Sequence, residues 1–218
     1  MTTYGARDVV CGACGNKFAV QVLYSTNTQG PSDLDGRPAE MQRSTMDTWV
    51  QRCGRCGYCA GDVSIFDDRL RAMLESQEYR AQAKDRSLSS RFACAGMLAA
   101  AAGNNSEAGW NYLWAAWDAD DRDLDLHARY FRQQAADAFL RVLSEGGAFL
   151  SRKGESEAIV ADCLRRARRD EEALALIEKA LAAGCEEIIA DLLGFQRELI
   201  ERDDRAAHVV SKAAKQNT

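Results

Sequence analysis

Proline is nearly absent from this sequence of 218 residues, because only Pro31 and Pro38 occur and both lie before residue 40. Everything after them lacks the strongest helix breaker, which favours long helices. Long apolar runs are also missing. The most apolar stretch, residues 92–102, is far shorter than the ~20 residues that a membrane span requires. Residues 1–10 show no basic segment followed by an apolar one, as a secretory signal would. We therefore expect a cytoplasmic protein without membrane contact.

The sequence has no strong excess of charge and no recognisable catalytic pattern. Its formal net charge is -5, which gives no general attraction to nucleic acid. It contains no phosphate-binding glycine loop, no nucleophile elbow and no grouping of carboxylates with histidine. The two histidines, His127 and His208, have no partner at ligand spacing. These absences predict a protein that is not an enzyme.

Eight cysteines are present, and in a reducing compartment paired cysteines indicate metal ligands rather than disulfides. Two pairs have the same form, C-G-x-C-G, and lie at residues 11–15 and 53–57. Two thiolates at this spacing reach one metal ion from a tight turn, and two such knuckles complete a tetrahedral site. We therefore predict one structural Zn²⁺ per chain, bound by Cys11, Cys14, Cys53 and Cys56.

Other roles for the cysteines stay open at this stage. The pairs could form a redox dithiol, although neither stands between a strand and a helix as a thioredoxin-type pair does. Cys59 continues the three-residue spacing of Cys53 and Cys56, so it could be an alternative ligand or part of an iron–sulfur arrangement. It could equally be a small buried side chain behind the site. Cys163 and the remaining cysteines, among alanine and leucine, are expected in the core.

The sequence divides into two regions of different pattern. Residues 1–66 predict a small β zinc ribbon, with strands over 17–24 and 47–52 and an inserted polar loop over 25–43. Residues 67–202 predict a mainly α region, and residues 203–218 a flexible tail. Capping residues and glycines mark the expected helices of this region: 87–103, 105–120, 123–145, 155–168, 171–183 and 187–202.

Small and large residues recur in the helical region at the offsets of a tetratricopeptide repeat. One unit comprises Phe92, Gly96, Ala108, Tyr112 and Ala115, and a second comprises Ala161, Leu164, Ala173, Ile177 and Ala180. We therefore expect a tetratricopeptide-like helical array, with a simple helical bundle as the alternative. Such arrays bind a partner on their concave face.

Candidate partner-binding residues follow from this alignment. The inner face would present Met97 from the first unit and Arg165 and Arg166 from the second, which suits an amphipathic or acidic-ended peptide. In the alternative interpretation, the arginines within residues 165–169 are solvated and balance the negative C-terminal end of the helix dipole. Trp110, Trp114 and Trp117 share one helical face and either pack in the core or form an exposed aromatic strip.

The two knuckles and their surroundings resemble a bacterial family, domain-of-unknown-function family 2225. The resemblance rests on Cys11-Gly-Ala-Cys14-Gly-Asn-Lys-Phe18, on Val50 to Ala60 with its second knuckle, and on the aromatic helix from Ala108 to Trp117. It covers nearly the whole chain and implies a zinc ribbon followed by a tetratricopeptide-like region, without an assigned activity. The chain departs from the family by glycine in place of proline in both knuckles and by Cys59 in place of alanine.

These patterns predict a non-enzymatic interaction adaptor that binds a protein or peptide on its helical array. The alternative is a regulator that binds nucleic acid through the ribbon. However, six basic and six acidic residues balance within residues 1–66. A third possibility is a redox switch that releases zinc when its thiolates are oxidised.

Overall fold

The structure is a computed structural model and describes residues 1–214. Its N-terminal strands form a hairpin. β1 (Thr3–Val10) pairs antiparallel with β2 (Lys17–Ser25), with Val9 opposite Phe18. The strand expected over residues 17–24 forms, and its alternate residues Phe18, Val20 and Val22 face the core in a regular alternation. Tyr24 does not follow it and is 69% exposed, because its ring lies over Gly5 of β1, where no side chain is in the way.

A second, shorter pair of strands carries the second knuckle. β3 (Gln51–Arg52) pairs antiparallel with β4 (Cys59–Ala60). The strand expected over residues 47–52 is limited to these last two residues, because Met46–Thr48 form the short 3-10 helix η1 and the chain turns there. The hairpin turn between β3 and β4 is the knuckle itself.

Helices make up most of the remaining chain, so the expected mainly α fold with a small N-terminal β region is confirmed. The six helices predicted from capping signals form with ends within three residues of expectation. They are α4 (Leu88–Ala101), α5 (Asn105–Asp121), α6 (Asp125–Ser144), α7 (Glu155–Arg166), α8 (Asp170–Ala182) and α9 (Glu187–Glu201). Shorter helical segments are α1 (Glu40–Arg43), η2 (Asp68–Leu70), α2 (Arg71–Glu75), α3 (Gln77–Lys84) and α10 (Ser211–Ala214).

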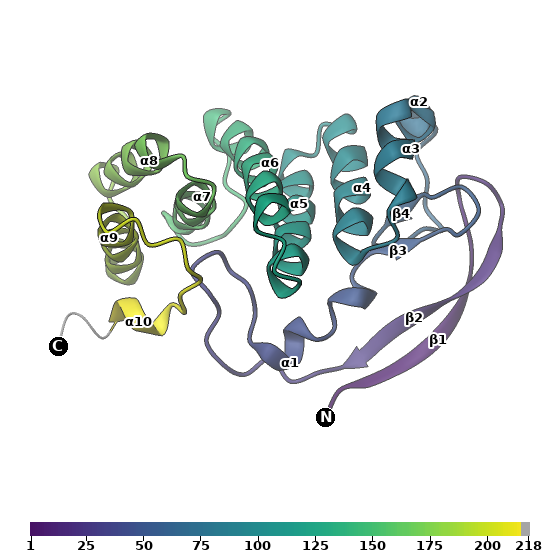
Figure 1. Cartoon of the computed structure of the whole chain (residues 1–218), viewed down its shortest axis with the longest axis horizontal. Coiled ribbons are helices and arrows are strands. Elements are labelled where there is room, and N and C mark those ends of the chain that lie inside the picture. Colours follow the sequence, from purple (N-terminus) through teal and green to yellow (C-terminus); the bar gives the residue numbers. More distant parts are fainter. Residues whose placement is uncertain (215–218) are drawn as a thin grey trace.

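Helices α4 to α9 form an arch in which each packs against the next (Figure 1). Small residues allow close approach. A Cβ atom on Gly96 of α4 would lie 3.1 Å from the ring of Tyr112 in α5, and one on Gly109 of α5 would lie 2.4 Å from the ring of Phe139 in α6. The small and large positions that suggested repeats thus lie between packed helices. The tetratricopeptide-like character of the array stays a prediction.

Residues 26–39, here called the crossing segment, run from the end of β2 beneath the arch to the C-terminal helices and back to α1 (Figure 1). Asp33 forms an antiparallel bridge with Val209, and the backbone N–H of Leu34 donates to the carbonyl of His208 at 2.8 Å. Leu34 and Asp35 are buried. The inserted polar loop is therefore an ordered part of the fold, because it makes backbone and side-chain contacts with distant helices.

The segment expected to begin a flexible tail is held by the same contacts. Residues 203–210 carry carbonyls that accept hydrogen bonds from Arg165 and Leu34, and α10 follows them. Residues 215–218 of the expected tail lie outside the described residues.

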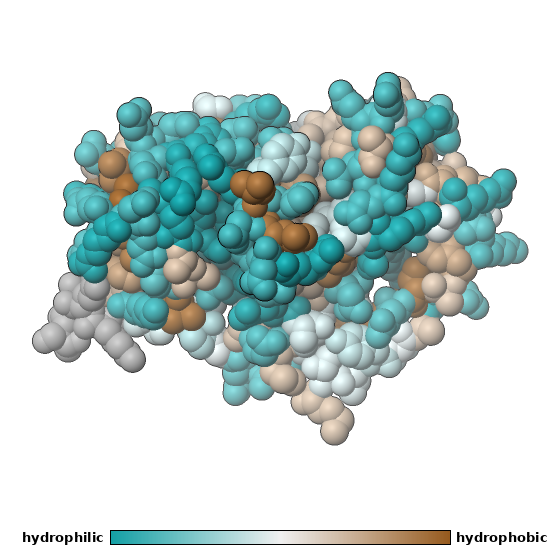
Figure 2. All heavy atoms as spheres, viewed as in Figure 1, coloured by the Kyte–Doolittle hydropathy of each residue, from teal (hydrophilic) through white to brown (hydrophobic). Residues whose placement is uncertain are grey.

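One hydrophobic core runs through the ribbon and the helices, since Tyr58 and Cys59 belong to the same cluster of buried residues as Phe92 and Leu113. The domain boundary expected between residues 66 and 67 stays a prediction. On the face shown in Figure 2 the exterior is mostly hydrophilic, with only small, separate hydrophobic patches. Among residues 1–214, no helix is both long enough and apolar enough to cross a bilayer.

Candidate functional site

The two cysteine knuckles have the same backbone geometry. In the first, the N–H of Gly15 donates to the carbonyl of Cys11 at 2.8 Å, and in the second the N–H of Gly57 donates to that of Cys53 at 2.9 Å. Both glycines have a positive φ, 71° and 79°, which other residues adopt only with strain. This left-handed turn brings the two thiols of each pair to the same side of the chain.

The two knuckles bring four sulfur atoms together. The Sγ atoms of Cys11 and Cys56 lie 3.8 Å apart, those of Cys14 and Cys53 lie 3.7 Å apart, and all four lie within 4.8 Å of one another. Two of the cysteines are buried and two are partly exposed. The four ligands predicted from the sequence are therefore adjacent, and together they can hold a metal ion.

The surroundings favour the thiolate form that a metal requires at Cys53, whereas burial raises the pKa of Cys11 and Cys56. Burial alone would raise the pKa of Cys53. Hydrogen bonds from the backbone N–H groups of Cys56 and Arg55, and from the neighbouring thiols, outweigh burial and lower that pKa to about 7. The side-chain amide of Asn16 also lies 3.8 Å from this sulfur as a donor.

Cys59 lies outside the four-sulfur group that the described residues form. Its thiol is buried and accepts from Nε of Arg52 at 3.3 Å, while Arg52 also contacts Cys94 at 3.6 Å and the hydroxyl of Ser90 at 3.0 Å. Burial opposes ionisation, but a hydrogen bond from Cys94 and the charge of Arg52 lower the pKa of Cys59 to about 7. Cys59 thus joins β4 to α4 outside the four-sulfur group, and it is buried as the packing interpretation expected.

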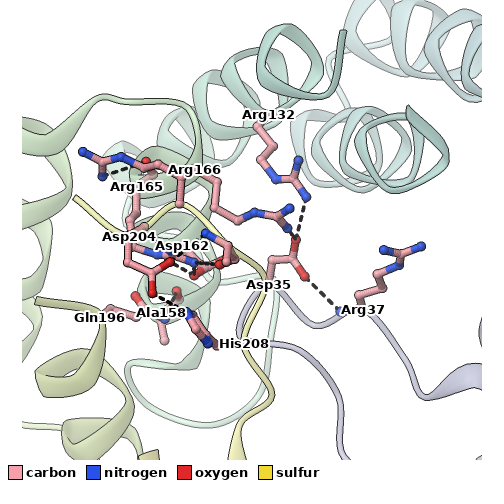
Figure 3. A network of polar contacts seen from close by, with 12 residues as sticks. Asp35, Arg37, Arg132, Ala158, Asp162, Arg165, Arg166, Gln196, Asp204 and His208 are labelled. Atoms are coloured by element: carbon pink, nitrogen blue, oxygen red, sulfur yellow. Dashed lines mark hydrogen bonds and ion pairs between the residues drawn. The ribbon is translucent and has the colours of Figure 1, made fainter. Parts of the chain in front are cut away.

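A second polar centre lies where the crossing segment meets the helices (Figure 3). Asp35 is fully buried and accepts hydrogen bonds from Nε1 of Trp117 at 2.9 Å, from Arg132 at 3.3 Å and from Arg166 at 3.2 Å. Both arginines also donate to Asp120, at 2.5 and 2.9 Å. Two guanidinium groups and two carboxylates therefore neutralise each other inside the protein. The role of Asp35 could not be predicted from the sequence, because a single aspartate in a polar segment carries no signal of burial.

The residues predicted to meet a partner are placed differently from one another. Arg165 is fully buried and donates to Asp162 at 2.7 Å and to the carbonyls of Asp204 and Ala206. Arg166 is 9% exposed and occupied by Asp35 and Asp120. Met97 is half-buried and packs against the core. The two arginines are thus not free for an acidic partner in this conformation, because the chain's own carboxylates and carbonyls already occupy them.

The tryptophans surround a cavity, here called the tryptophan cavity, of about 560 Å³ between the crossing segment, α1 and α5. All four tryptophans of the sequence line it: Trp49, Trp110, Trp114 and Trp117. The rings of Trp49 and Trp114 pack edge to face with centroids 5.2 Å apart. Trp117 is buried, whereas the other three are partly exposed. The aromatic face predicted on this helix therefore contributes both to the core and to an open surface.

Protein-family models, curated proteins and solved structures were each compared with the chain, and none of them matches it. The resemblance to family 2225 stays a prediction.

Proposed function

We propose that this protein is a non-enzymatic interaction adaptor that binds a segment of a partner protein at the tryptophan cavity. The observation that carries the proposal is the gathering of all four tryptophans around one open cavity. Tryptophan is enriched among the residues that dominate binding energy, and concave, mostly apolar surfaces are where ligands bind. The sequence pattern also predicted that the helical array binds a segment of a partner.

In this proposal the four cysteines bind one zinc ion with a structural role. A tetrahedral site with Zn–S bonds of ~2.3 Å has sulfur atoms about 3.8 Å apart, and two of the sulfur pairs lie at 3.8 and 3.7 Å. Four thiolates leave no open position for a substrate. All eight cysteines are free, which agrees with a reducing, cytoplasmic location.

Blocking the cavity tests the proposal. Thr28 is an exposed residue of the crossing segment that lines the cavity, whereas its neighbour Gln29 is exposed and does not line it. Thr28→Trp should fill the cavity and lower recovery of a partner from host extract at least tenfold, while Gln29→Trp should leave recovery unchanged. Equal recovery by both variants, with unchanged melting temperatures, would remove the cavity from the proposal.

Binding of nucleic acid through the ribbon stays the alternative. Arg7 of the hairpin lies 3.7 Å from Asp62, so part of the ribbon's positive charge is balanced within the chain. Binding to DNA or RNA that disappears at moderate salt would count against this alternative.

A further inference from the structure

A second cavity, of about 460 Å³, lies beside the tryptophan cavity, between the crossing segment, α7, α9 and α10. Its walls are mostly apolar, and they include Leu34, Ile159, Ile188 and Leu192. Ile188, on α9, is 49% exposed at this site. We call it the acidic-rimmed cavity, for the reason given next.

Three carboxylates line this cavity: Asp33, Glu155 and Asp191. Each is partly buried, and none of them has an ion pair or accepts a side-chain hydrogen bond within residues 1–214. Arg152 also lines the cavity, but it is bound to Glu186 at 2.5 and 3.0 Å. The lining therefore combines an apolar interior with three carboxylates that form no ion pair within residues 1–214, although the charges of Arg37, Arg43 and Arg166 offset part of the charge of Asp33.

The charge at Asp33 is held at an energetic cost. Burial, and then the neighbouring charge of Asp35, raise the pKa of Asp33 above its ordinary value. A positive group near this carboxylate would relieve that cost, since an opposite charge stabilises the ionised form. The cavity is thus suited to a ligand that brings positive charge together with an apolar group.

The two cavities are neighbours with shared walls, because Ser32, Gly36 and Trp110 line both. An extended chain that places one side chain in the tryptophan cavity can place another in the acidic-rimmed cavity. Side chains of a strand lie ~3.3 Å apart per residue along the chain, so a few residues reach both sites. This arrangement favours a peptide over an isolated small amine.

We propose that the acidic-rimmed cavity receives an apolar side chain of the partner segment that is flanked by lysine or arginine. The proposal rests on the proposed adaptor function and gives the chemistry of its partner. It reverses the expectation of an acidic partner, because the arginines on which that expectation relied bind carboxylates of the chain itself. Basic residues would meet Asp33, Glu155 and Asp191, and the apolar side chain would pack against Ile188 and Leu192.

Peptide selection tests the inference. A random dodecapeptide library displayed on phage is selected against the full zinc-loaded chain. Enriched sequences should contain lysine or arginine beside leucine, isoleucine, phenylalanine or methionine. A synthetic peptide of the enriched sequence should bind the variant Asp33→Asn/Glu155→Gln/Asp191→Asn at least tenfold more weakly. Glu157→Gln is the control, since Glu157 lies on α7 close to Glu155 but does not line the cavity.

Each outcome decides something. If acidic or uncharged peptides were enriched instead, and Thr28→Trp abolished their binding, the inference of a basic partner would be wrong and the adaptor function would stand. Absence of any enriched sequence would contradict both. Equal affinity of the triple variant and the wild type would also overturn the inference, and if the triple variant did not fold, the single variant Asp191→Asn should still bind more weakly than Glu157→Gln.

Discussion

Replacing Asp35 by asparagine should destabilise the protein more than any other single change of a charge in the crossing segment. Asparagine keeps the size of the side chain and can still accept from Trp117. However, Arg132 and Arg166, which are 2% and 9% exposed, would then share the single carboxylate of Asp120. Breaking a buried ion pair in this way costs about 3–5 kcal/mol, because the remaining charge stays buried without compensation.

The magnitude is large against the total stability of a typical domain, ~5–15 kcal/mol. For a chain of this size each kcal/mol lowers the melting temperature by about 2–4 °C, so the variant should melt roughly 6–20 °C below the wild type. Urea denaturation followed by tryptophan fluorescence measures the loss of stability, and Trp117 itself reports on the site. Asp33→Asn is the matched control: its side chain has no ion pair within the described residues and its charge is held at a cost, so this variant should not lose more than about 0.5 kcal/mol of stability.

The pH dependence of stability gives an independent check. Burial opposes ionisation, but the charges of Arg166 and Arg132 outweigh it and lower the pKa of Asp35. A depressed pKa in the folded state means that the contribution is fully present above the unfolded pKa of ~3.9 and is lost as the pH falls through the folded value. The wild type should therefore lose part of its advantage over Asp35→Asn below about pH 4. A loss of less than 1 kcal/mol at neutral pH in Asp35→Asn would refute the reasoning.

Three further predictions concern the metal and the helix contacts. Elemental analysis should find one zinc per chain. Cys56→Ser should lose the zinc, and Cys59→Ala should keep it. Loss of the zinc in Cys59→Ala alone would mean that the ligand set is wrong. Gly109→Ala should destabilise the protein by about 1–3 kcal/mol, because the added Cβ would meet the ring of Phe139 at 2.4 Å. Gly194→Ala in α9 should instead stabilise it by about 0.5–1 kcal/mol, because a Cβ there would meet no other side chain within 4 Å. Calorimetry distinguishes the two signs. Chelation should unfold the ribbon and, because the core is continuous, also lower the melting temperature of the helices. An unchanged helical transition in circular dichroism would instead support the domain boundary expected at residues 66–67.

The long helices could be predicted from the sequence because their signals are local. Ser87, expected as a cap, accepts from the N–H of Ser90 at 3.1 Å, and Gly103, expected as a stop, has a φ of 78°. The cluster of four cysteines was predictable for the same reason, since each knuckle is set by five consecutive residues. Such features depend on neighbours in the chain and survive whatever the tertiary arrangement is.

Features that depend on distant partners were not predictable. β1 has no apolar alternation of its own and forms by pairing with β2. Asp35 is buried only because Trp117, Arg132 and Arg166 reach it from three different helices. Arg165 belongs to a run that suits a helix end, yet residues 204–206 return to cover it. The burial of Asp35 and Arg166 could not be predicted from the sequence, because these two partners lie 131 residues apart.

The long separation of the two knuckles gains a physical explanation from these contacts. A metal ion held by the four cysteines would close residues 15–52 into a loop, and closing a long flexible loop costs entropy that grows slowly with its length. That cost is reduced here because the crossing segment is not free within the loop: Asp35 holds its middle to the arginines, and its bridge to Val209 holds it to the C-terminal segment. Their neighbours in the crossing segment, Ser32 and Gly36, line both cavities. The four-cysteine cluster thus holds the ends of this loop and the Asp35 centre holds its middle. The shape of the proposed binding surface depends on both, although no cysteine of the knuckles lines either cavity.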